Sequence, residues 1–115
     1  MRRPIKRKAH GAIDYAFLAA NLVAPSVLGL EGPARTLPYL FGAVQGALNA
    51  VTDQPLALKA VVPFRTHGTL ELASGPAFVA LPWLTSALAQ PRARAFFGLT
   101  GVALVAVYSL TDWEA

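Results

Sequence analysis

The sequence predicts an all-α membrane protein with four transmembrane helices, arranged as two tandem repeated helical hairpins with both termini in the cytoplasm. Three observations predict this fold class: an apolar composition, four long uncharged stretches and an internal repeat. The 115 residues are 55% hydrophobic and 14% charged, with a mean hydropathy of +0.47, whereas soluble domains are about 25% charged. Such a chain is too apolar to be disordered and has too few polar residues to cover a soluble bundle. It contains no cysteine, which excludes disulfides and thiol chemistry.

The uncharged stretches predict where the helices lie. Pairs of charged residues bound four of them: Asp14 and Glu31, Arg35 and Asp53, Glu71 and Arg92, and Arg94 and Asp112. A helix needs about 20 residues to cross a bilayer, with a range of roughly 17–25. Apolar residues occupy nearly every face of each stretch, as expected of helices surrounded by lipid. We therefore expect helices over 10–30, 37–53, 67–89 and 94–112.

The distribution of basic residues predicts the orientation. Seven lie in the N-terminal tail and the middle connection (Arg2, Arg3, Lys6, Arg7, Lys8, Lys59 and Arg65), against three in the opposite loops (Arg35, Arg92 and Arg94). Because cytoplasmic loops of membrane proteins are enriched in Lys and Arg, we expect a multi-pass protein of a bacterial inner (plasma) membrane. The basic tail is expected to contact anionic membrane lipids, and no nucleic acid partner is expected.

An internal repeat divides the chain into two halves. The segment HGAIDYA at 10–16 aligns with HGTLELA at 67–73, and a two-residue shift pairs Thr52 with Thr111 and Asp53 with Asp112. Two such halves in the same orientation form a parallel repeat about an axis along the membrane normal. The expected organisation is a basic cytoplasmic tail over 1–9, a first hairpin over 10–53, an interfacial cytoplasmic loop over 54–66 and a second hairpin over 67–115.

Small residues and prolines indicate how these helices pack. Gly42, Gly46 and Ala50 recur every fourth residue, which lets helix backbones approach closely and suggests self-association or a place in a larger membrane complex. Pro25 and Pro82 occupy matching positions of the two halves and are expected to bend the first helix of each deep in its length. The apolar middle loop is expected to form a short interfacial helix.

Six ionisable residues are expected to gather at the cytoplasmic end. His10 and Asp14 are four residues apart, as are His67 and Glu71, so each pair shares one helix face. Asp53 and Asp112 end the second and fourth helices, and the hairpins return them close to the starts of the first and third. One interpretation is structural, with the histidines pairing with the carboxylates. The alternatives are a divalent metal site formed by His10, Asp14, His67 and Glu71, or a haem held between the two histidines.

Five short motifs extend over most of the chain: HGAIDY at 10–15, TDQPLAL at 52–58, VVPFRTHG at 61–68, LPWL at 81–84 and LTDW at 110–113. In these motifs the chain resembles small bacterial four-helix membrane proteins related to the SPW-repeat type. The resemblance implies a polytopic inner-membrane protein of uncharacterised function. It supplies no catalytic residues.

The sequence thus favours a small non-enzymatic membrane protein with a structural or accessory role, without catalytic residues and without a cofactor. A metal- or haem-binding protein with a cytoplasmic-side His/carboxylate site is the first alternative. A small ion or proton transporter is the second, because ionisable residues within membranes mark ion pathways, although no such residue lies at mid-depth here.

Overall fold

The computed structural model describes residues 3–115, and it confirms an all-α fold of four helices. Along the chain lie α1 (Arg7–Val27), α2 (Pro33–Ala50), α3 (Phe64–Ala80), two short 3-10 helices, η1 (Leu81–Leu84) and η2 (Ser86–Leu88), and α4 (Pro91–Leu110). The only β-type pairings among the described residues are two isolated bridges, Ile5 with Thr111 and Thr52 with Val62.

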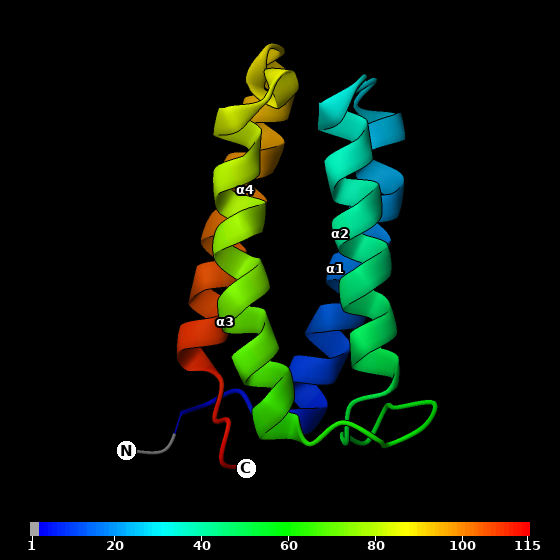
Figure 1. The fold of residues 1–115 in the computed structure, drawn as a ribbon, viewed down its shortest axis with the longest axis vertical. Coiled ribbons are helices and arrows are strands. Elements are labelled where there is room, and N and C mark those ends of the chain that lie inside the picture. The colour runs from blue at the N-terminus through cyan, green and yellow to red at the C-terminus, as the bar shows by residue number, and fades with distance from the viewer. Residues whose placement is uncertain (1–2) are drawn as a thin grey trace.

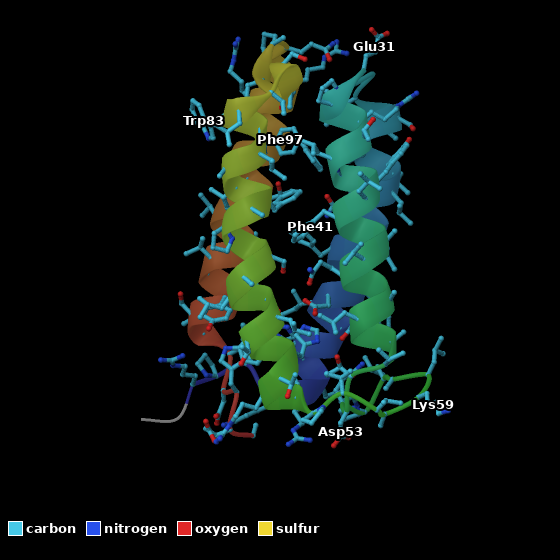
Figure 2. The ribbon with its side chains drawn as sticks, viewed as in Figure 1. Glu31, Phe41, Asp53, Lys59, Trp83 and Phe97 are labelled. Carbon is cyan, nitrogen blue, oxygen red and sulfur yellow. The ribbon has the colours of Figure 1, made fainter. Side chains whose placement is uncertain are left out.

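The four helices form two hairpins that stand side by side, α1 with α2 and α3 with α4 (Figure 1). Both termini and the 51–63 connection lie at one end of the molecule, hereafter the termini end. The α1–α2 turn and the η1–η2 region lie at the opposite end, with Glu31 and Trp83 there and Asp53 and Lys59 at the termini end (Figure 2). This arrangement agrees with the predicted grouping of the termini with the middle connection.

The prolines lie closer to the helix ends than expected. Pro25 is in the last turn of α1, which ends when Gly29 adopts a φ of 66° and the N–H of Leu30 bonds to the Pro25 carbonyl. The expected continuous helix over 67–89 is wrong. Regular helix α3 runs from Phe64 to Ala80, and Pro82 lies in η1. A proline has no N–H to continue the helical ladder, and its ring crowds the carbonyl four residues earlier.

Two glycines allow α1 and α2 to approach closely. A Cβ atom added at Gly42 would lie 2.8 Å from the Cβ of Asn21, and one at Gly46 would lie 2.7 Å from Cδ2 of Leu18. Both neighbours belong to α1. The small-residue stripe is therefore used within one chain, and it no longer argues for self-association.

Phenylalanines fill the space between the two hairpins. Each helix contributes one: Phe17 from α1, Phe41 from α2, Phe78 from α3 and Phe97 from α4. Phe78 lies 4.2 Å from Phe41, 5.9 Å from Phe17 and 5.8 Å from Phe97, between ring centroids. These contacts join the hairpins through apolar surface in the half of the molecule away from the termini end (Figure 2).

The middle connection contains no helix between Thr52 and Pro63, so the expected interfacial helix is wrong. Backbone hydrogen bonds fold the segment back on the end of α2 instead, from Leu58 N–H to the Ala50 carbonyl (2.8 Å) and from Asp53 N–H to the Val62 carbonyl (2.7 Å). Leu58 is 88% exposed. The connection therefore exposes apolar surface although it forms no helix.

Among the helices within residues 3–115, α4 alone is long and apolar enough to cross a membrane by itself. Helix α3 has 17 residues, which is below the roughly 20 residues that a bilayer core requires.

Candidate metal centre

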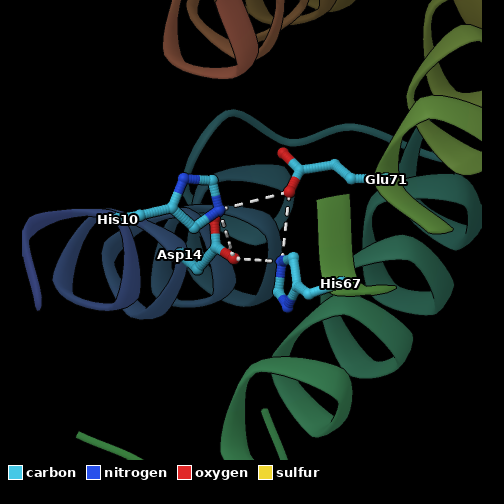
Figure 3. A group of neighbouring side chains, drawn as sticks. All are labelled: His10, Asp14, His67 and Glu71. Carbon is cyan, nitrogen blue, oxygen red and sulfur yellow. Dashed lines mark hydrogen bonds and ion pairs between the residues drawn. The ribbon is translucent and has the colours of Figure 1, made fainter. Parts of the chain in front are cut away.

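Four side chains from two helices meet near the termini end. His10 and Asp14 come from α1, and His67 and Glu71 come from α3 (Figure 3). The i,i+4 spacing places both members of each pair on one face of their helix. The Nε2 atom of His10 lies 3.2 Å from both Asp14 Oδ2 and Glu71 Oε2, and the Nε2 atom of His67 lies 3.1 Å from both. The four atoms form a ring in which nitrogen and oxygen alternate.

The cluster is closed to solvent. Both histidine side chains are 0% exposed, Glu71 is 2% and Asp14 is 12%. On the side of the termini end, aromatic rings cover it: the Trp113 ring lies 4.7 Å from the His10 ring, and the Phe64 ring lies 5.7 Å from it. Buried charges are costly unless they are paired or coordinated, so the carboxylates require a partner of opposite charge.

Two threonines set the orientation of the imidazoles. Thr111 Oγ1 lies 2.9 Å from His10 Nδ1, and Thr52 Oγ1 lies 2.7 Å from His67 Nδ1. Each threonine also donates its single hydroxyl proton to the carbonyl four residues earlier, on Val107 and Leu48. Each hydroxyl oxygen must therefore accept a hydrogen bond from Nδ1–H. The Nε2 atom of each ring, which faces the carboxylates, is then free to hold a second proton or a metal ion.

The two carboxylates are not equivalent. Glu71 Oε2 has hydrogen-bond geometry with both Nε2 atoms. Asp14 Oδ2 is just as close to them and pairs with both histidines, but without the hydrogen-bond geometry that Glu71 has. Its buried charge is balanced by the two imidazoles when they are protonated, or by a cation in the space that it faces.

The spacing of the four atoms fits a transition-metal ion. Zinc binds imidazole nitrogen at about 2.0–2.1 Å and carboxylate oxygen at about 2.0–2.2 Å. Neighbouring ligands around such an ion lie roughly 2.9–3.4 Å apart, from square to tetrahedral geometry. The 3.1–3.2 Å edges fall in this range, and one atom from each of the four residues lies within 4.8 Å of all the others. Haem does not fit, because the carboxylate oxygens occupy the space between the imidazoles that a porphyrin would need.

The structure leaves two predicted members outside the cluster. Asp53 forms an ion pair with Arg7 at 3.3 Å, near the start of α1 as expected. Asp112 pairs with Lys6 at 2.7 Å, just before the start of α1, while the next two residues, Trp113 and Glu114, contact the first turns of α3. The expectation that these aspartates pair with the histidines is wrong, because the threonine before each of them contacts the imidazole instead.

Sequence reasoning did not assign a role to Thr52, Thr111, Phe64 or Trp113. The threonines carried a signal, since they recur at matching positions of the two halves. Trp113 lies against Gly68, where an added Cβ would be 2.7 Å from the indole ring. The residue next to His67 is therefore a glycine because the indole occupies that space.

Comparison of the chain with protein-family models, with curated proteins and with solved structures finds no match.

Proposed function

We propose that this chain is a small integral membrane protein that binds one divalent transition-metal ion between its two hairpins, and that zinc is the preferred ion. His10 Nε2, Asp14 Oδ2, His67 Nε2 and Glu71 Oε2 are the ligands. The observation that carries the proposal is the alternating ring of these four atoms, with edges of 3.1–3.2 Å, in a site closed to solvent. The role of the ion is structural or accessory, and the protein is not an enzyme.

The character of the ligands supports zinc and a structural role. Two imidazoles and two carboxylates suit zinc, and they also accept iron or manganese. Structural zinc sites are four-coordinate and closed, whereas catalytic sites keep one position for water or substrate. Here all four positions come from side chains, three of them buried and Asp14 12% exposed, and the hydroxyls of Thr52 and Thr111 hold the imidazoles by Nδ1. Hydrogen-bond partners at the second imidazole nitrogen commonly fix the orientation of metal-ligating histidines.

The surface of the molecule supports the membrane part of the proposal. Large apolar side chains point outward along the length of the helices; Val23, Val27, Leu40, Val44, Leu99 and Val102 are each more than half exposed. Patches of this extent mark contact with a partner or with lipid. We assign the lipid-facing role to α1, α2, α4, and α3 extended by η1. The termini end, which carries Lys6, Arg7, Lys59 and Arg65, faces the cytoplasm of a bacterial inner membrane.

The transporter alternative has little support. Phe17, Phe41, Phe78 and Phe97 fill the space between the hairpins beyond the cluster. An ion that left the cluster along the helix axes would pass the hydrogen bond between Gln45 and Ser74 and then meet these rings, so no continuous polar path leads away from the cluster in this direction.

A metal-free accessory protein is the second candidate. Glu71 Oε2 lies within hydrogen-bond distance of both Nε2 atoms. If each Nε2 carries a proton, two imidazolium groups balance two carboxylates, and the cluster joins the hairpins as an ion-pair network. This arrangement needs no ion, so metal content separates the two candidates.

The test is the zinc content of matched variants. The protein is purified in mild detergent, equilibrated with Zn²⁺, desalted and analysed by elemental mass spectrometry. We expect one zinc per chain in the unmodified protein. Asp14→Asn removes one ligand, and retained zinc should fall to about a tenth or less, since losing even a supporting group costs about 10–100-fold in affinity. Asp53→Asn makes the same chemical change at an exposed ion pair of the same end and should retain the zinc.

Two results would contradict the proposal. An unmodified protein that is folded but retains no zinc, iron or manganese supports the ion-pair network instead. Equal zinc in the Asp14→Asn and Asp53→Asn variants would place the ion outside this cluster.

A further inference from the structure

The segment 111–115, which we call the strap, crosses the termini end of the molecule directly over the cluster. Thr111 accepts the hydrogen bond from His10 Nδ1, and the Trp113 ring lies 4.7 Å from the His10 ring, 6.0 Å from the His67 ring and 5.0 Å from the Phe64 ring. The strap therefore both orients one ligand and covers two of them.

The other walls of the cluster are more firmly built. Helices α1 and α3 supply the ligands themselves, and the phenylalanines of all four helices close the side away from the termini end. On the flank of α2, Asn49 donates a hydrogen bond to the Gly11 carbonyl at 2.9 Å, and Gln54 donates one to the Asn49 carbonyl at 3.0 Å. Opening these walls would separate packed helices, and the pocket of about 400 Å³ between α3 and α4 that Glu71 lines is otherwise apolar.

The strap is held by contacts that open at lower cost. It has no helix of its own, and one backbone hydrogen bond joins it to the N-terminal segment, from Asp112 N–H to the Ile5 carbonyl (2.7 Å). The Arg7 side chain also donates a hydrogen bond to the Ala115 carbonyl. Its acidic side chains form ion pairs at the surface, Asp112 with Lys6 and Glu114 with Arg65. The Arg65 and Glu114 side chains are 71% and 68% exposed. Thr111 and the Trp113 ring pack against the cluster, but the remaining bonds of the strap are exposed polar bonds outside regular secondary structure, which are typical of segments that open locally.

A shallow pocket of about 280 Å³ lies against the strap, lined by Arg3, Thr111, Asp112, Trp113 and Glu114. It adjoins Thr111, whose hydroxyl contacts His10. The pocket therefore lies beside the residue that orients a proposed ligand, and Thr111 itself is fully buried in the closed arrangement.

From these observations we propose that the strap controls the exchange of the divalent ion, which enters and leaves at the termini end when residues 111–115 detach. This inference rests on the metal site proposed above and adds the route to it. Detachment uncovers both imidazoles and releases His10 Nδ1 in one movement. Since surface ion pairs hold the strap, dissolved salt that screens them should accelerate exchange.

The test measures zinc uptake and zinc release separately. Stopped-flow mixing of the metal-free protein with Zn²⁺ gives the uptake rate, and mixing the zinc-loaded protein with an excess of a coloured chelator gives the release rate. Asp112→Asn with Glu114→Gln removes both ion pairs and leaves the four ligands and Thr111 in place. We expect both rates to rise about three- to tenfold, the range that two weak surface pairs allow, while the dissociation constant stays unchanged.

The control variant is Glu31→Gln, which removes an exposed carboxylate at the opposite end of the molecule, away from the strap. Both of its rates should equal those of the unmodified protein. Ionic strength supplies a second measurement that needs no substitution: raising it should accelerate both rates in the unmodified chain and have a smaller effect on the double variant.

Each outcome decides between the claims. If the release rate rises while the uptake rate stays the same, the dissociation constant increases. The strap then contributes to affinity and does not control access, which overturns the inference. Unchanged rates in the double variant also overturn it and place the route elsewhere, while the metal site stands. If the unmodified protein takes up no zinc, the proposed function itself fails.

Discussion

Each imidazole of the cluster depends on a threonine from the opposite half of the chain. Thr52, at the end of the first hairpin, accepts the Nδ1 bond of His67, and Thr111, at the end of the second hairpin, accepts that of His10. Because each threonine proton is already donated to a helix carbonyl, the hydroxyl oxygen is a fixed acceptor. The result is one tautomer for both rings, with Nε2 directed to the centre.

Replacing either threonine by valine should therefore weaken metal binding. Thr111→Val keeps the shape of the side chain but leaves Nδ1–H of His10 without an acceptor. We expect about 10–100-fold lower zinc affinity, the usual effect of losing such an outer partner, measured by competition with a chelator of known affinity. Thr111→Ser restores the hydroxyl and should restore most of the affinity. Equal affinities for the valine and serine variants would show that the hydroxyl does not orient the ring.

The spacing of ionisable residues was enough to predict the four members of the cluster, because i,i+4 pairs on two helices must share faces. It was not enough to predict that Thr52 and Thr111 contact the imidazoles, and that the aspartate after each of them does not. Thr111 has extended backbone angles (φ −80°, ψ 134°), and successive residues of an extended backbone point to opposite sides. The threonine thus faces inward and the aspartate faces the basic N-terminal segment, a difference that depends on exactly where α4 ends.

At the scale of elements, the contact of α1 with α2 relies on two glycines that differ in what they touch. The neighbour of Gly42 is the Cβ of Asn21, which is fixed to the backbone, whereas the neighbours of Gly46 are the terminal methyl groups of Leu18. A methyl group added at the first position must separate the helices. At the second it can be accommodated by rotation of a side chain.

We accordingly predict that Gly42→Ala destabilises the protein more than Gly46→Ala. The first change should lower the free energy of unfolding by about 1–3 kcal/mol, the range for overpacking, and the second by less. Gly98 in α4 is the control, since an added Cβ meets nothing within 4 Å there, and Gly98→Ala should be neutral or stabilising by up to about 1 kcal/mol. Denaturant unfolding in detergent measures all three. An equal loss at Gly42 and Gly98 would contradict the close approach.

The number and order of the helices could be predicted from the uncharged stretches, but their ends could not. Charged residues mark the limits of an uncharged stretch, but they do not show at which residue helical hydrogen bonding ends. Pro82 ends α3 early and leaves two short 3-10 helices before α4, and Pro33 lets α2 begin before the charged Arg35, since a proline suits the first turn of a helix. The middle connection was apolar enough to suggest a helix, yet backbone bonds to Ala50 and Val51 fold it as a turn.

For the whole molecule, the proposed insertion places Lys59 and Glu31 on opposite sides of the membrane. Both residues are exposed, at opposite ends of the structure (Figure 2). The chain has no cysteine, so Lys59→Cys and Glu31→Cys each introduce a single reactive thiol. We expect a membrane-impermeant maleimide to label Glu31→Cys from outside intact cells and to label Lys59→Cys only after the membrane is opened.

The unmodified chain is the background control for that labelling. Labelling of both variants from outside would show that the chain is not inserted as proposed, and labelling of Lys59→Cys alone would reverse its orientation. The charge pattern predicts the orientation and the repeat predicts that the four residues gather at one end, whereas the burial of the cluster and its cover by Phe64 and Trp113 appear only in the folded molecule.

The crossed threonine–histidine bonds also bear on how the protein is made. When a ribosome has delivered the first hairpin, His10 and Asp14 are present, but α3 with His67 and Glu71 is still to come. His10 gains its acceptor only when Thr111 is synthesised, after all four helices. The complete cluster thus forms only once both hairpins are present, and a proposed ion held there would bind only those copies in which the two hairpins have been inserted and joined.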